Sequence, residues 1–208
     1  KLACVIHDDV TTTDELIPSG ETSSYRSNPL KLAEFALSRR EPEYVNRAKA
    51  VASEEKKRRE SASEEVNAVL SKVCDNYDET AKHTQFGSCV FACRPGDGSA
   101  REQAASCQKV LGGFGDICYE FATKRYRSNC INWGMLPFLC NKEKFSVGDY
   151  VYIGGIREAV ETGAENITVH CLSLKSGAKL KEEQSYIKGD RVSLMIEKSR
   201  EILSNSGY

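Results

Sequence analysis

Short apolar runs alternate with amphipathic stretches through the middle of the chain. The pattern predicts a strand at 88–93, a helix over 99–111, a strand near 115–119, a helix over 121–133 and a short strand at 135–139. Strands that alternate with helices of this length are typical of parallel sheets, because each helix carries the chain back across the sheet. This part of the chain is therefore expected to form a parallel α/β unit.

Both ends of the chain favour strands as well. Residues 1–10 alternate weakly and predict a strand on which Leu2, Cys4 and Ile6 share one face. Residues 145–208 predict mostly short strands separated by glycine turns. These later strands are expected at 149–153, 167–174 and 191–196.

The region between the first strand and the α/β unit is more polar. Residues 11–29 are rich in Thr, Ser, Pro and Gly, and they predict a long loop of the kind that is usually functional or disordered. A short helix is expected over 30–37. Residues 43–73 then predict helix with a very polar middle at 54–65.

Four consecutive basic residues, Lys56 to Arg59, lie in that polar middle. They could contact nucleic acid or form a solvated helix face. Glu54, Glu55 and Glu60 flank them at helical spacing, which favours the solvated face with its local ion pairs.

Composition narrows the class of protein. The 208 residues, 40% of them hydrophobic, suit one large domain with a real core, and we expect a single domain over 1–208. The 29 basic and 30 acidic residues leave a net charge of −1, which gives no general attraction to nucleic acid or anionic membranes. No apolar run approaches the ~18 residues of a membrane span. The chain begins at Lys1, without a Met and without a secretory signal. We therefore expect a processed protein or a fragment of a larger one, and we favour the fragment.

Nine cysteines are spread along the chain, an odd number that contains no Cys-x-x-Cys pair. Several of them, such as Cys89 and Cys93, lie in apolar runs, where free cysteine behaves as a small buried hydrophobe. We therefore expect reduced structural thiols, no metal site in this chain and a cytoplasmic location.

The segment Gly96-Asp97-Gly98-Ser99-Ala100-Arg101-Glu102 joins the end of an expected strand to the start of a helix. Ligands collect at the carboxyl ends of strands in open α/β sheets, and helix N-termini attract anions. Arg101 can clamp a carboxylate with two hydrogen bonds. Ser99 with Glu102 also fits a capping box without any catalysis, so both interpretations of Ser99 stay open. No Gly-x-Ser-x-Gly is present, and a Ser-His-Asp hydrolase is not indicated.

A second segment, Thr12 to Gly20 followed by Tyr25-Arg26, places Asp14 and an arginine in one loop after a strand. Taken by itself, this segment is most simply a turn with an aspartate cap and a surface arginine.

Together the two segments resemble the aconitase and isopropylmalate isomerase family of hydro-lyases. The order Thr-Thr-Asp, Pro-Ser-Gly and Arg26 resembles the opening of the family's swivel domain, and Gly98 to Ala105 resembles its Gly-Ser-Ser-Arg-Glu active-site segment. Its continuation is matched by Phe121-Ala122, Arg127-Ser128-Asn129 and Gly134-Met135-Leu136-Pro137. The resemblance covers about 1–30 and 86–200, and it leaves 40–82 as a charged helical insertion.

The resemblance implies a swivelling β/β/α three-layer domain, as in aconitase domain 4 and the isopropylmalate isomerase small subunit. It implies the dehydration and rehydration of a hydroxy di- or tricarboxylic acid. Ser99 would be the general base, and Arg101 would support the serine oxygen and the substrate. Arg26 would hold a substrate carboxylate, Asp14 would orient the arginines, and the backbone N–H of Ala100 would contact the substrate.

The resemblance also implies a [4Fe–4S] cluster, held by cysteines of other domains or of a large subunit, so the isolated chain should be inactive. Two residues depart from the family pattern: Ala100 replaces its second serine, and Glu15 stands where histidine is common. These departures leave the substrate open. The favoured interpretation is the C-terminal domain of a multidomain hydratase. The alternatives are a separately encoded small subunit and a degenerate homologue with a binding role such as RNA binding, against which the near-zero net charge argues.

Overall fold

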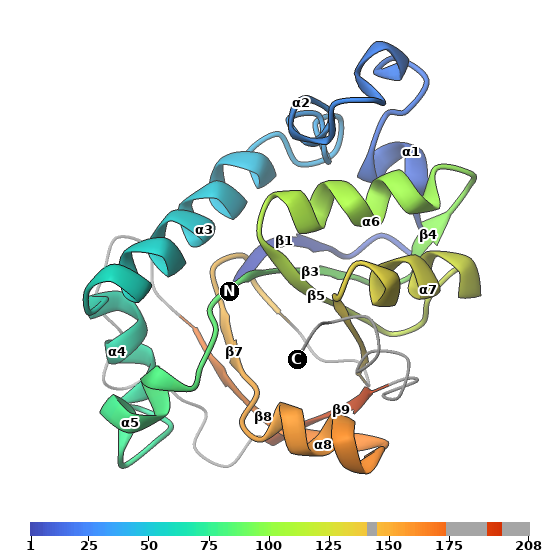
Figure 1. Ribbon diagram of the computed structural model, residues 1–208. Coiled ribbons are helices and arrows are strands. Elements are labelled where there is room, and N and C mark those ends of the chain that lie inside the picture. Colours follow the sequence, from blue (N-terminus) through green and yellow to red (C-terminus); the bar gives the residue numbers. More distant parts are fainter. Residues whose placement is uncertain (141–144, 174–190, 197–208) are drawn as a thin grey trace.

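Four parallel strands form one side of the main sheet in the computed structural model, which describes residues 1–140, 145–173 and 191–196 (Figure 1). The strands are β1 (Leu2–Ile6), β2 (Thr11–Thr12), β3 (Ser88–Ala92), β4 (Pro95–Asp97), β5 (Gly113–Cys118), β6 (Leu136–Leu139), β7 (Tyr150–Tyr152), β8 (Asn166–Leu172) and β9 (Arg191–Ile196). The helices are α1 (Thr13–Leu16), the 3-10 turn η1 (Ser23–Tyr25), α2 (Pro29–Ala33), α3 (Tyr44–Glu60), α4 (Glu64–Leu70), α5 (Tyr77–Lys82), α6 (Arg101–Val110), α7 (Lys124–Asn132) and α8 (Ile156–Thr162).

The predicted parallel α/β unit is confirmed. Strands β1, β3, β5 and β6 pair in that order, all parallel, and α6 and α7 are the crossovers that connect β3 to β5 and β5 to β6. Gly112 and Gly134 end the two crossovers with φ values of 88° and 66°, a conformation that glycine adopts without steric cost.

An antiparallel group of strands continues the sheet in the order β9, β8 and β7, next to β6. The segment before β7 returns to the first strand, because Leu2 N–H donates to Asp149 O and Gly148 N–H donates to Leu2 O, both at 2.8 Å. The strands predicted within 145–208 are therefore confirmed, whereas helix α8 was not predicted. Residues 174–190 and 197–208, which that prediction also covered, lie outside the described residues.

Three layers result from this arrangement. Figure 1 shows α6 and α7 on one side of the parallel strands and β8, β9 and α8 on the other. Neighbouring residues of β3 point into two different cores: Val90 packs beneath the helices with Ala105, and Phe91 packs with Ile117 and Val169 between the two groups of strands. The β/β/α three-layer architecture predicted from the sequence is thus observed.

Strand β1 departs from the predicted alternation. Cys4 and Ile6 lie in the core beneath the helices, but Leu2 lies in the core between the strands. The pairing of β1 with β3 shifts register between Leu2 and Cys4. A one-residue irregularity turns the following side chains to the opposite face, so the expectation that all three residues share a face is wrong.

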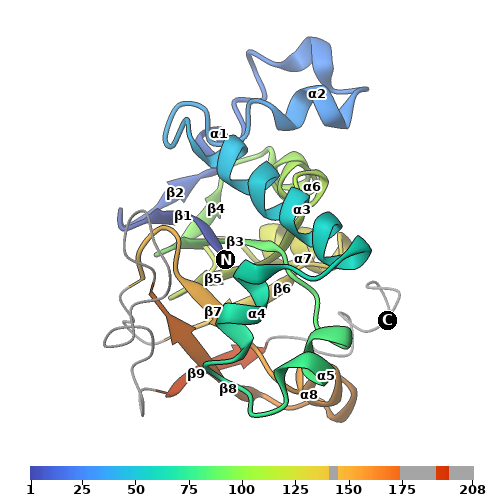
Figure 2. The same ribbon diagram turned by 90° about the vertical axis from the view of Figure 1, so that its left-hand side faces the viewer.

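The polar stretch at 40–82 contains α3, α4 and α5, in agreement with the helical prediction. Figure 2 shows α3 and α4 in front of the main sheet. Glu55, which is 7% exposed, accepts hydrogen bonds from Arg58, Arg59 and the backbone N–H of Phe86. Burial alone would raise the pKa of Glu55, but the two guanidinium groups lower it below its ordinary value. The basic run therefore forms local ion pairs, as predicted. The single-domain boundary and the status of 40–82 as an insertion stay predictions.

Candidate functional site

The two sequence segments singled out above lie side by side in the structure. Strand β2 directly follows β1, strand β4 directly follows β3, and the two short strands pair in parallel, Thr11 with Pro95 and Thr12 with Asp97. The segment expected to be one long loop, 11–29, thus begins with a strand and a helix. Because β1 and β3 are parallel neighbours, both segments leave the same carboxyl edge of the sheet.

Thr13 joins the two segments. Its hydroxyl accepts a hydrogen bond of 3.3 Å from the backbone N–H of Ala100. Gly98, with φ at +134°, passes so close that a Cβ there would lie 2.2 Å from Thr13 Oγ1. Both the backbone conformation and the contact require glycine at position 98, and together they fix the loop before α6 against α1.

Ser99 does not cap helix α6. The helix begins at Arg101, its N-cap residue is Ala100, and no side chain forms a cap hydrogen bond there. Glu102 instead accepts a hydrogen bond of 3.0 Å from the indole N–H of Trp133, the C-cap residue of α7. The capping-box interpretation of Ser99 and Glu102 is therefore wrong. Ser99 itself is exposed, and no hydrogen bond of its side chain occurs among the residues that the structure describes.

A capping box does occur in the other segment. Thr12 is the N-cap of α1, its hydroxyl accepts from Glu15 N–H at 3.2 Å, and Glu15 accepts from Thr12 N–H at 2.7 Å. Glu15, noted above as a departure from the family pattern, thus stabilises the start of α1, a contribution of about 1 kcal/mol.

Asp14 lies exposed on α1 and forms an ion pair with Arg39, with 2.5 Å between its Oδ2 and Arg39 Nη1. Arg39 also pairs with Glu21. Leu37, with φ at +55°, makes the turn that brings Arg39 here, and its N–H donates to Leu16 O at 2.9 Å. The sequence analysis missed Arg39, because its position depends on the positive φ of Leu37, and no sequence pattern indicates that conformation for a leucine.

Arg101 carries an unpartnered donor. The residue is half-buried, and its Nε is buried without a hydrogen-bond partner among the described residues. Buried side-chain donors are nearly always paired in folded proteins, so an orphan guanidinium nitrogen beside the Ser99 loop indicates a missing acceptor. A carboxylate of a ligand is the acceptor that a guanidinium matches best.

Arg26 follows η1 and is exposed. Its placement in a common site with Ser99 and Arg101 stays a prediction.

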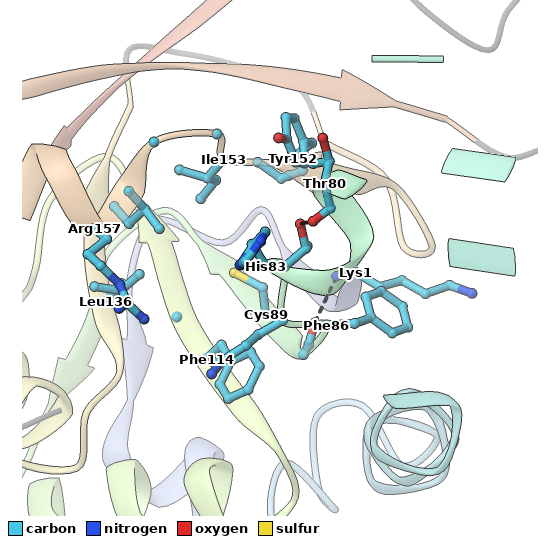
Figure 3. Close-up of a pocket in the computed structure, with 18 of the residues that line it drawn as sticks. Lys1, Thr80, His83, Phe86, Cys89, Phe114, Leu136, Tyr152, Ile153 and Arg157 are labelled. Carbon is cyan, nitrogen blue, oxygen red and sulfur yellow. Dashed lines mark hydrogen bonds between the residues drawn. The ribbon is translucent and has the colours of Figure 1, made fainter. Parts of the chain in front are cut away.

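A large cavity in the described part of the chain lies elsewhere. It has a volume of about 1060 Å³ and is lined at the amino ends of the parallel strands by Cys89, Phe114 and Leu136, and by His83 and Arg157 from neighbouring segments (Figure 3). None of the predicted site residues lines it. We place the candidate site at the opposite, carboxyl edge of the sheet, because the unpartnered arginine and the joined segments lie there.

Two further features concern metals and membranes. Among the described residues, no group of three or more His, Cys, Asp or Glu side chains is placed to hold a metal ion. No helix in the described ranges is long and apolar enough to cross a membrane.

The fold and the site together define an α/β swivel-type domain with an arginine-bearing loop at its carboxyl edge. The chain shares the fold of the crystal structure of 3-isopropylmalate dehydratase (leuD) from Methanocaldococcus jannaschii, with a TM-score of 0.50, 18% identity and coverage of 96% of this chain and 85% of that one. It is 37% identical over 76 residues to the methanogen homoaconitase small subunit of the same organism, a match that covers 36% of this chain and 44% of that protein. The match thus spans less than half the length of that curated relative. No family model matches the chain. The two similarities confirm the resemblance to the aconitase and isopropylmalate isomerase family.

Proposed function

We propose that this chain is the substrate-binding and base-supplying part of an aconitase-like hydro-lyase, which dehydrates and rehydrates a hydroxy di- or tricarboxylic acid. The observation that carries the proposal is the unpartnered guanidinium nitrogen of Arg101 next to the exposed Ser99, at the edge where the Asp14 segment meets the start of α6. The fold shared with 3-isopropylmalate dehydratase and the sequence similarity to a homoaconitase small subunit support it.

In this proposal Ser99 removes a proton from the carbon next to a substrate carboxylate. The electron pair of the C–H bond forms the C=C bond, and the hydroxyl on the neighbouring carbon leaves. The N-terminus of α6 and the charge of Arg101 both favour a negatively charged serine oxygen, so their sign suits a serine base. A positioned general base contributes about 10²–10⁴-fold to the rate.

Substrate binding is assigned to the arginines and to the loop backbone. Arg101 and Arg26 would each bind a carboxylate, and Asp14 would orient arginine side chains. Its partner Arg39 adds a third guanidinium to this edge. The Ala100 N–H, which donates to the Thr13 hydroxyl at 3.3 Å, would donate to the substrate instead.

The leaving hydroxyl would be bound by a [4Fe–4S] cluster carried by other domains or by a large subunit. Among the described residues, no group of three or more His, Cys, Asp or Glu side chains is placed to hold it. We call the assembly of this chain with the cluster-bearing part the complete enzyme. The name of the similar homoaconitase small subunit supports a partner of this kind. Cysteines that form no disulfide fit a cytoplasmic protein.

The proposal predicts different behaviour for the chain alone and for the complete enzyme. After anaerobic reconstitution with iron and sulfide, the 208-residue chain should be folded, colourless and inactive. The complete enzyme should show the cluster absorbance and convert a hydroxy di- or tricarboxylic acid. Circular dichroism, visible absorbance and a panel of such acids are the measurements.

Two outcomes would contradict the proposal. A stoichiometric cluster spectrum from the chain alone would show that the metal ligands are misassigned. A cluster-loaded complete enzyme that converts no acid of the panel would favour the degenerate, non-catalytic alternative.

A further inference from the structure

The start of helix α7 is bonded to the segment that leads into the Ser99 loop. The backbone N–H of Ala122, just before the helix, donates to Pro95 O at 2.9 Å. Thr123, the N-cap of α7, donates from its hydroxyl to Gly96 O at 3.0 Å. The first residues of β4 are therefore bonded to the start of α7, so the loop that follows takes its position from this helix.

Tyr126 packs directly against that loop. A Cβ at Gly96 would lie 2.4 Å from both Cγ and Cδ1 of the Tyr126 ring, much closer than any van der Waals contact. Gly96 has φ at +95°, and Tyr126 is 0% exposed. The ring thus supports the backbone of the turn from which Gly98 and Ser99 continue.

The ring is fixed at its other end. The Tyr126 hydroxyl donates to Asp116 Oδ2 at 3.0 Å and accepts from Gln108 Nε2 at 2.9 Å. Asp116 belongs to β5 and Gln108 to α6, so the hydroxyl joins the sheet and both crossover helices. All three side chains are buried, and a fully paired buried hydroxyl allows the ring few alternative positions.

We propose that Tyr126 is a positioning residue, which holds the Gly96–Arg101 loop so that Ser99 and Arg101 meet the substrate in register. The chain of contact runs from the Asp116 and Gln108 bonds through the ring to Gly96, and from there to Gly98, which Thr13 fixes from the other side. The catalytic part of this inference rests on the proposed function, whereas the positioning of the loop does not.

The test compares two glycines with nearly the same φ. Gly96 has φ at +95° and meets the Tyr126 ring, while Gly148 has φ at +94° and has nothing within 4 Å of the point where a Cβ would lie. Gly96→Ala and Gly148→Ala carry similar backbone strain, and only the first disturbs the contact with the ring.

Tyr126→Leu removes the ring and Tyr126→Phe removes only its two hydrogen bonds. Cys130→Ala, which removes another donor to Asp116 Oδ2 without touching Gly96, is the matched control.

All variants are made in the complete enzyme and measured in two ways. Hydrogen exchange by mass spectrometry follows the backbone of 97–101, which includes the Ala100 N–H, and steady-state kinetics separates kcat from KM. We expect exchange to accelerate in Gly96→Ala and Tyr126→Leu, less in Tyr126→Phe, and to stay unchanged in the Gly148→Ala and Cys130→Ala controls. The same order is expected in kcat, with a loss on the order of 10²-fold for a loop displaced by about 1 Å.

The results separate the inference from the function on which it rests. Unchanged exchange at 97–101 in Gly96→Ala and Tyr126→Phe, or an equal change in Gly148→Ala, would overturn the positioning role even if Tyr126→Leu failed to fold. Faster exchange at 97–101 together with a normal kcat would overturn the proposed contribution of Tyr126 to catalysis. Faster exchange in an enzyme whose wild type converts no acid would leave the loop contact in place and reject the proposed function.

Discussion

Ser99→Ala in the complete enzyme is expected to lower kcat by on the order of 10²-fold or more and to leave stability almost unchanged. The loss of rate follows because alanine has no side-chain oxygen that could accept the substrate proton. Stability should change by less than about 0.5 kcal/mol, because Ser99 is exposed and caps nothing. The measurement is kcat on an acid that the wild type converts, together with the melting temperature.

A matched serine controls for the substitution itself. Ser53 is also exposed, on α3, and Ser53→Ala should leave both kcat and the melting temperature as in the wild type. A Ser99→Ala variant with near-normal kcat would remove the general-base assignment. Since the structure has already excluded the capping role, Ser99 would then have no assigned role.

Asp116 should make the stability of the chain depend on pH. Burial raises the pKa of this carboxyl from its ordinary 3.8 to about 6, although hydrogen bonds from Cys130 and Tyr126 oppose the rise. Its Oδ1 is buried and has no partner among the described residues. A raised carboxyl pKa means that the folded state binds the proton more tightly, so this contribution to stability is complete below about pH 3 and is lost as the pH rises through about 6.

The size of the effect follows from the change in pKa. At about 1.4 kcal/mol for each pKa unit, the rise from 3.8 to about 6 corresponds to about 3 kcal/mol. Asp116→Asn keeps the shape and stays neutral at every pH. The free energy of unfolding of the wild type, measured in urea relative to this variant, should therefore fall by about 3 kcal/mol between about pH 3 and pH 7.

Asp97→Asn is the control for this experiment, because Asp97 is exposed and its loss should shift stability little at any pH. A difference between wild type and Asp116→Asn that stays constant over the same pH range would contradict the account. It would mean that the Asp116 carboxyl is hydrated or paired in the folded state.

The parallel core was predictable because its elements are long enough to show their own pattern. The hydrophobic pattern indicates whether each segment is a strand, as at 88–93, or a helix, as in the two crossovers. Gly112 and Gly134 mark where the two crossover helices end. The reversal of faces on β1 was not predictable, because a single irregular residue between Leu2 and Cys4 leaves no trace in so short a strand. Tertiary pairing, not local propensity, decides such a register.

The local structure of the two candidate segments was predicted in part, and the errors have physical causes. The pattern Ser99-x-x-Glu102 fits a capping box, but Trp133, distant in sequence, binds Glu102 and the helix begins later. The same pattern at Thr12 and Glu15 does form the box, within a stretch whose composition indicated a loop. That the two segments meet could be expected from their places after parallel strands. The pairing of Asp14 with Arg39 could not, because it depends on the turn at Leu37.

The central claim is that a side chain of this chain, Ser99, removes the proton from the substrate carbon. Its most direct test is solvent deuterium incorporation, measured by mass spectrometry on the hydroxy acid after incubation with the complete enzyme in heavy water. The account predicts that the wild type labels the carbon next to the carboxylate and that Ser99→Ala leaves it unlabelled over the same time, with the cluster content equal in both. Labelling by Ser99→Ala at the wild-type rate would contradict the account.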